Sequence, residues 1–321
     1  MRFVAPRSAP KGFARRVPPA IFSVQLGLFG LGLAWRRAVV AFDLPAGLAE
    51  AALGAISLFF VYTMCSYAAK FMRRPAVVID DLAVLPGTLG LSAMMVCLYL
   101  LASAMSPYAP DLARVILLGG IGLHGVLICL ILWHFARGPA ERRRYSPTGH
   151  LYFVSPIVAG MVAAQAGYDY LALGLIGFTL LLAVGIWSWG ADRMWRGGMT
   201  PALRPALALH LVPAAVGGLG AAYLDLMGFA QVMAAISAVI LLGLILGIRQ
   251  ITAAGFSPFW SSAIFPLAAT SSLWISLGGK WQIAGGLALI GATLVGLPIA
   301  YRIVKLWLSG QLAVRTNAAI A

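Results

Sequence analysis

The sequence predicts an all-α integral membrane protein with ten transmembrane helices. Of the 321 residues 61% are apolar and only 10% are charged, and the mean hydropathy of +0.93 is far above that of soluble domains. A membrane-spanning helix needs roughly 17–25 mostly apolar residues. The ten stretches that meet this need are 18–35, 46–69, 82–105, 112–135, 150–168, 170–190, 205–224, 227–248, 257–278 and 282–308. They are too continuously apolar for the alternating strands of a membrane barrel.

Lys and Arg are distributed unevenly between the two sides of this topology. Nineteen of the 23 fall on the side that holds both termini, and the four on the other side are Arg36, Arg37, Arg114 and Lys280. Basic residues are retained on the cytoplasmic side, so both termini are expected in the cytoplasm, which requires an even number of spans. The same loops account for the net charge of +14 without a nucleic-acid partner.

This topology divides the chain into three parts. We expect a basic cytoplasmic tail over 1–17, a transmembrane pore domain over 18–308 and a short cytoplasmic tail over 309–321. No cleavage site follows the first apolar run, so the protein is expected to be a multi-pass protein of the inner (plasma) membrane.

Each odd-numbered span contains a proline of one regular series, and successive members are 67, 70, 57 and 53 residues apart, about one helical hairpin each. They are Pro19, Pro86, Pro156, Pro213 and Pro266. A proline inside a helix removes a backbone hydrogen bond and bends the axis. In hydrocarbon the freed carbonyl must find protein or a lined cavity. The pattern therefore predicts five hairpins, with five bent helices around a central pore and the even-numbered helices facing lipid.

Several kinds of chemistry are missing from the spans. Of the nine acidic residues only Glu50 lies within a span, which excludes a cation pathway or a carboxylate proton relay. The four histidines show neither a metal-binding spacing nor a facing pair, and the three cysteines follow no zinc pattern. We therefore expect no metal, no cofactor and no enzymatic activity.

What remains is a path without negative charge and with basic residues at its cytoplasmic mouth, which favours small anions. Arg16, Arg73 and Arg204 are candidates for that mouth. The candidate polar residues of the pore are Thr88, Ser155, His210, Ser261 and Ser262.

Four stretches resemble the tellurite-resistance/dicarboxylate transporter (TDT) family, which includes the TehA-like bacterial proteins and the plant slow anion channels. They are Pro18-Pro-Ala with Gly30-Leu-Gly-Leu-Ala-Trp-Arg36, Gly149-His-Leu-Tyr-Phe-Val-Ser-Pro156, Leu209-His-Leu-Val-Pro213 and Phe259-Trp-Ser-Ser-Ala-Ile-Phe-Pro266. The similarity covers about residues 17–312. It implies five hairpins around a central pore, a homotrimer with one pore per subunit, and a phenylalanine of span 9 that plugs the pore. The matching residue is Phe265.

The resemblance implies small inorganic anions, sulfite or C4-dicarboxylates as substrates, and a link to tellurite resistance. The leading expectation is an anion channel or uniporter gated by Phe265. The alternative is a proton-coupled carrier for dicarboxylates, sulfite or another oxyanion, in which His210 or His124 titrates.

Overall fold

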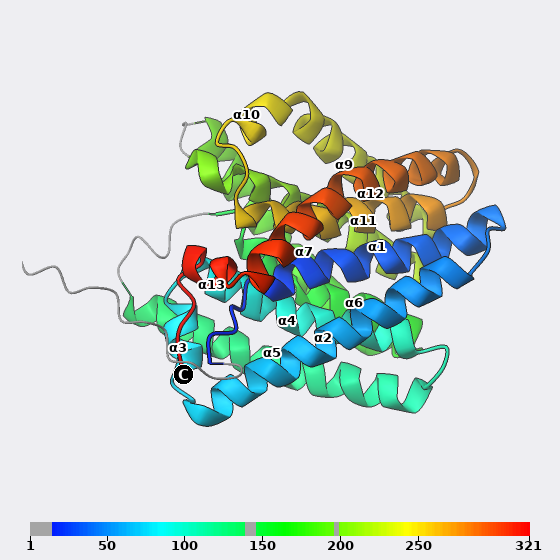
Figure 1. The fold of residues 1–321 in the computed structure, drawn as a ribbon. Coiled ribbons are helices and arrows are strands. Elements are labelled where there is room, and N and C mark those ends of the chain that lie inside the picture. Colours follow the sequence, from blue (N-terminus) through cyan, green and yellow to red (C-terminus); the bar gives the residue numbers. More distant parts are fainter. Residues whose placement is uncertain (1–14, 139–145, 196–198) are drawn as a thin grey trace, which may run out of the picture.

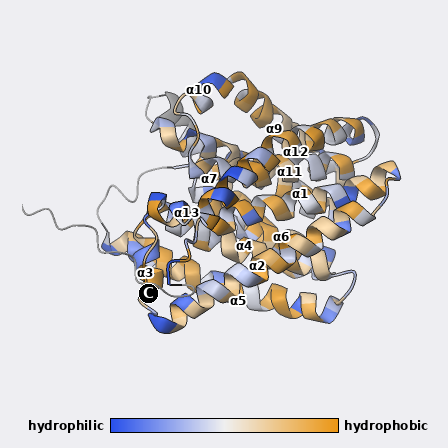
Figure 2. Ribbon diagram, in the orientation of Figure 1, coloured by the Kyte–Doolittle hydropathy of each residue, from blue (hydrophilic) through white to orange (hydrophobic). Residues whose placement is uncertain are grey.

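The computed structural model describes residues 15–138, 146–195 and 199–321, and side chains in all of these except 191–195. Within these ranges the chain is mostly helical and contains no strand (Figure 1). Apolar residues run along the length of the long helices (Figure 2). The predicted all-α class is confirmed.

Seven helical segments among the described residues are long and apolar enough to cross a membrane. They are α2 (Gly47–Arg73), α4 (Leu85–Met105), α5 (Pro110–Arg137), Asp169–Gly190 of α7 (Asp169–Trp195), η3 with α8 (Pro201–Tyr223), α9 (Met227–Leu246) and α12 (Gly279–Leu308). The chain is therefore a multi-pass membrane protein. The count of ten spans stays a prediction, because α1 (Ile21–Phe42) carries Arg36 and Arg37 and two further segments contain only short α-helices.

Five segments form a closed inner ring. The helix α1 contacts α4 and α11, α4 contacts α6 (Pro156–Gln165), and α8 (Leu211–Tyr223) contacts α6 and α11 (Ile264–Ser276). Three of these helices follow a segment of another helix type: the π-helix η2 (His150–Val154) and the 3₁₀-helices η3 (Pro201–His210) and η4 (Pro258–Ala263).

The helices α2, α5, α7, α9 and α12 lie outside the ring and are continuous over 20 to 30 residues. Their outward faces carry large apolar side chains, such as Leu118 at 48%, Val239 at 72% and Leu294 at 71% exposure. Ring residues such as Phe22, Tyr99 and Val158 are completely buried. This distribution fits a helix bundle whose outer surface faces hydrocarbon.

The prolines of the odd-numbered spans lie at helix starts, which differs from the prediction of bends within helices. Pro19 precedes α1, and Pro86 and Pro156 lie in the first turns of α4 and α6. Pro213 and Pro266 are the third residues of α8 and α11, directly after 3₁₀ turns. The first four N–H groups of a helix have no partner within it, so a proline costs little there.

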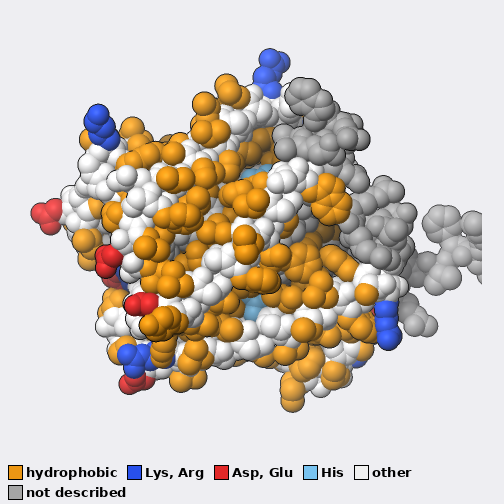
Figure 3. Space-filling view, turned by 180° about the vertical axis from the view of Figure 1, so that it is seen from behind, with side chains coloured by type: hydrophobic (Ala, Val, Ile, Leu, Met, Phe, Trp, Pro, Cys, Tyr) orange, Lys and Arg blue, Asp and Glu red, His pale blue; other side chains and the backbone are white. Residues whose placement is uncertain are grey.

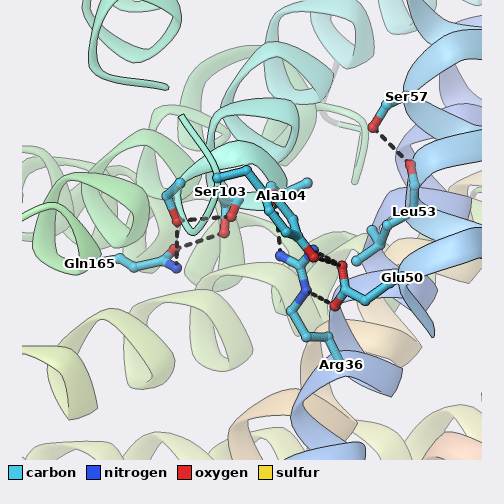
Figure 4. A network of polar contacts seen from close by, with 9 residues as sticks. Arg36, Glu50, Leu53, Ser57, Ser103, Ala104 and Gln165 are labelled. Atoms are coloured by element: carbon cyan, nitrogen blue, oxygen red, sulfur yellow. Dashed lines mark hydrogen bonds and ion pairs between the residues drawn. The ribbon is translucent and has the colours of Figure 1, made fainter. Parts of the chain in front are cut away.

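Polar contacts hold the bundle together at one end of α2. Arg36 of α1 donates from Nε and Nη2 to the two carboxylate oxygens of Glu50, at 2.6 and 2.5 Å, and from Nη1 to the carbonyl of Ala104 in α4, at 3.0 Å (Figure 4). Nearby, Ser103 donates to Oε1 of Gln165 at the end of α6, at 2.7 Å. These contacts connect α1, α2, α4 and α6.

A buried ion pair lies at the opposite end of α2. Lys70 Nζ is 2.7 Å from Asp81 Oδ2 in α3 (Val77–Leu82), and both side chains are completely buried. Lys70 also donates to the carbonyl of Val17 at 3.0 Å, and the backbone N–H of Ala319 donates to Asp81 Oδ1 at 2.9 Å. The C-terminal segment, which includes α13 (Gln311–Arg315), is thus packed against the bundle beside α3 (Figure 1).

Replacing Asp81 with alanine leaves the Lys70 ammonium buried without its counter-ion. We expect Asp81→Ala to destabilise the protein by about 3–5 kcal/mol, measured as a lower Tm in detergent. The control is Asp80→Ala, which removes the neighbouring exposed pair with Arg74 and should cost about 0–1 kcal/mol. Equal losses for the two variants would contradict a structural role of the buried pair.

Candidate functional site

A small cavity lies inside the ring, and its wall is formed by α1, α4 and α11 and by the segments η2, η3 and η4. Its volume is about 20 Å³. The lining residues are Ala20, Ser23, Leu26, Pro86, Leu89, Leu151, Leu209, Pro258, Phe259, Ser261, Ser262 and Phe265. A site that holds one water needs roughly 10–15 Å³ by the same measure, so this cavity has room for about one water molecule. In this conformation the ring is closed to a hydrated anion.

The cavity lies where the ring helices begin. Ala20 is the residue before α1, Pro86 is the second residue of α4, and Ser262 is the second residue before α11. Leu151 and Leu209 lie in the π and 3₁₀ segments that precede α6 and α8. The first N–H groups of these helices already have partners in the preceding turns, as Ile21 N–H has in the carbonyl of Pro18 and Ile264 N–H has in that of Ser261. What the helix starts offer an anion is therefore the positive end of their dipoles.

Charged side chains play no direct part in the wall. None of the residues that line the cavity in the described chain is charged, and the polar side chains among them are serines. Ser261 donates to the carbonyl of Pro258 at 2.8 Å, and Ser262 donates to that of Phe259 at 2.6 Å. Each hydroxyl must turn away from its own backbone to donate to an anion in the cavity.

Phe265 reaches the cavity from α11 and packs against the backbone of α1. Its side chain is only 5% exposed. A Cβ atom placed on Gly30 would lie 2.8 Å from Cδ2 of Phe265, which is closer than van der Waals contact allows. Gly27, one turn earlier, likewise leaves room for Ile264, whose Cβ would be 2.6 Å away. The two glycines of α1 therefore let Ile264 and Phe265 of α11 pack closely against α1.

The other predicted pore residues lie outside the cavity wall. Thr88 is buried and donates to the carbonyl of Leu82 at 3.0 Å. Ser155 is buried and donates to that of Leu151 at 2.7 Å. Of the five prolines, only Pro86 lines the cavity. Sequence reasoning missed Leu26, Leu89, Leu151 and Leu209, since nothing distinguishes these leucines from the other leucines of the spans.

His210 forms a pair that its position in the sequence does not reveal. Its Nδ1 lies 2.9 Å from Nε2 of His150, 60 residues earlier. The expectation that no histidines face each other is therefore wrong, because η2 and η3 bring together residues from two separate hairpins. In the described part of the chain no group of three or more His, Cys, Asp or Glu side chains could hold a metal ion.

The predicted arginines of the mouth lie away from the cavity wall. Arg16 is half-buried two residues before Pro18, with an Nε that has no hydrogen-bond partner. Arg204 in η3 donates to the carbonyl of Gln250 at 3.0 Å. Arg73 is exposed at the end of α2. All three lie near the end of the ring where its helices begin.

The contact between Gly30 and Phe265 can be tested as a packing interaction. We expect Gly30→Ala to lower stability by about 1–3 kcal/mol, because the new methyl group overlaps the ring of Phe265. The loss should shrink in a Phe265→Ala background, and a double-mutant cycle on Tm measures the coupling. Gly119→Ala is the control, since its methyl group would meet nothing within 4 Å. An equal cost of Gly30→Ala in both backgrounds would contradict the contact.

Comparison with known proteins assigns the family. The family model SLAC1, described as voltage-dependent anion channel, matches residues 16–308, which is most of the chain and includes every residue of the cavity wall. A search of curated proteins found no match. The predicted TDT resemblance is confirmed, and the protein is an anion channel or transporter of the membrane. The chain belongs to the SLAC1 family within the TDT group.

Proposed function

We propose that the protein is an anion channel or uniporter whose path follows the axis of the inner ring. One observation carries the proposal: helix starts surround a cavity that, among the described residues, no charged side chain lines. In the proposed topology ten helices form five hairpins with both termini in the cytoplasm. All five ring helices then begin on the cytoplasmic side, where the basic residues gather.

An anion approaches through the field of the basic residues, among them Arg16, Arg73 and Arg204. It loses water at the cavity, where the positive ends of the helix dipoles and the hydroxyls of Ser261 and Ser262 replace part of its hydration shell. The ring of Phe265 closes the path until it rotates. A fixed acid is absent from the wall described above, so no carboxylate repels the ion.

The proposed substrates are small inorganic anions, oxyanions such as sulfite, and C4-dicarboxylates, and the proposed physiological link is tellurite resistance. We propose that the protein acts in the inner (plasma) membrane as a homotrimer with one pore per subunit. Neither a cofactor nor a metal takes part in this function.

Removal of the Phe265 ring should open the path. We expect voltage-driven anion flux into proteoliposomes to rise strongly in Phe265→Ala relative to the unaltered protein, because the ring fills the axis of a cavity that holds about one water. Phe29→Ala is the control. Phe29 is a fully buried phenylalanine of α1, in the same ring of helices, and it does not line the cavity. Unchanged flux in folded Phe265→Ala would refute the gate.

The second candidate function is a proton-coupled anion carrier, which the contact between His150 and His210 favours. Imidazoles are the side chains that change charge near neutral pH. For a channel we expect flux through Phe265→Ala to vary little across roughly pH 5–8, since none of the described residues that line the cavity is titratable in this range. Flux that follows an imposed pH gradient, and that His210→Gln abolishes, would instead establish the coupled carrier.

A further inference from the structure

A second and larger cavity lies outside the ring, between α5 and α7. Its volume is about 510 Å³. On α5 it is lined by Ile121, Gly125, Ile128 and Leu132, and on α7 by Leu175, Phe178, Leu182 and Ile186. These positions are three or four residues apart, so each set forms one face of its helix. Tyr99 of α4, Phe153 of η2 and Pro156 of α6 form the floor, and we call this cavity the α5–α7 groove.

The polar side chains of the groove already have partners. The Tyr99 hydroxyl lies 2.9 Å from His124 Nδ1, and His124 Nε2 lies 3.4 Å from Ser155 Oγ. Thr179 donates to the carbonyl of Leu175 at 2.6 Å. A polar ligand would therefore lose its own hydration and find no free group to replace it. The groove is suited to a purely apolar occupant.

The surroundings of the groove identify that occupant. Both walls belong to helices that are long and apolar enough to cross a membrane. At its edges Leu132 and Phe178 are 51% and 63% exposed, so the groove opens toward the hydrocarbon of the bilayer. On the face shown in Figure 3, apolar side chains cover the middle, charged side chains lie toward the edges, and histidine atoms are visible beneath the apolar surface.

We propose that the α5–α7 groove binds the acyl chain of a bilayer lipid. An apolar cavity of roughly 150 Å³ binds benzene in another protein, so a groove of about 510 Å³ has room for a much longer hydrocarbon. Gly125 of α5 lines the groove without a side chain. A Cβ placed there would meet nothing within 4 Å.

The acyl chain reaches a segment that is otherwise covered. Within residues 150–164, which are all described, Phe153 and Pro156 alone are partly exposed, and both line the groove. Leu151 of the same segment lines the central cavity. The lipid chain therefore packs directly behind one wall of the central cavity. This inference depends on the membrane location and not on conduction.

Photo-crosslinking with a phosphatidylcholine that carries a diazirine near the end of one acyl chain tests the proposal. The full chain is reconstituted with this lipid, irradiated and digested, and the adducts are mapped by mass spectrometry. We expect adducts on Phe153 or Pro156, in addition to adducts on outward positions such as Val239. Gly125→Phe should abolish the first adducts and keep the second, whereas Gly119→Phe, also on α5 but outside the groove, should keep both.

Two results would overturn the proposal. One is the absence of adducts on Phe153 and Pro156 in the unaltered protein while Val239 is labelled. This result is expected if a second copy of the chain covers the groove. The other is labelling of Phe153 or Pro156 that persists in Gly125→Phe. If Gly125→Phe does not fold, Ile128→Trp fills the same groove from the next turn of α5 and serves as the second variant.

Discussion

The whole arrangement depends on one constraint: inside a bilayer every backbone N–H and C=O group must be paired by the protein itself. The outer helices satisfy it internally, as unbroken α-helices such as α5 with 28 and α12 with 30 residues. Three of the ring segments are less regular, because η2, η3 and η4 replace part of the α-helical pattern before α6, α8 and α11. Such backbone is tolerated at membrane depth only where protein or a lined cavity surrounds it. The outer helices thus allow the inner ones to be irregular.

That irregularity lies where the central cavity is. The segments η2, η3 and η4 all contribute to the wall of the cavity. Leu151 belongs to η2, Leu209 to η3 and Ser262 to η4. A change of helix type repositions backbone groups without needing a charged side chain, and π-turns are often found at functional sites. In the proposed function the ring directs helix dipoles toward an anion, and the apolar residues of the wall limit competing water.

The sequence was informative where a physical signal repeats. Long apolar runs predicted the helices, and the spacing of Pro86, Pro156, Pro213 and Pro266 predicted where ring helices lie, although the prolines stand in the first turns of the α-helices. It was silent on contacts between distant segments. The pairing of His150 with His210 depends on how two hairpins pack, and the burial of Lys70 with Asp81 depends on the fold of the C-terminal segment. A lysine near the end of a span is ordinarily read as an interfacial residue.

The leucines that line the central cavity could not be predicted from the sequence, and the reason is physical. Leu26 and Leu89 resemble every other leucine of the spans, and only the close approach of α1 and α4 selects them. That approach depends on Gly90, where a Cβ atom would lie 2.2 Å from the carbonyl carbon of Pro19. The contact of α1 with α11 depends in the same way on Gly27 and Gly30. These glycines let the helices come close enough for the lining side chains to narrow the cavity.

The segment formed by η2 and α6 joins the two cavities of the molecule. Leu151 faces the central cavity, while Phe153 and Pro156, two and five residues later, face the α5–α7 groove. Close-packed interiors transmit displacements because there is little free volume to absorb them. A π-turn followed directly by Pro156 has fewer regular hydrogen bonds to hold it than a continuous helix has. An occupant of the groove therefore contacts the same irregular segment of the ring that contributes Leu151 to the wall of the central cavity.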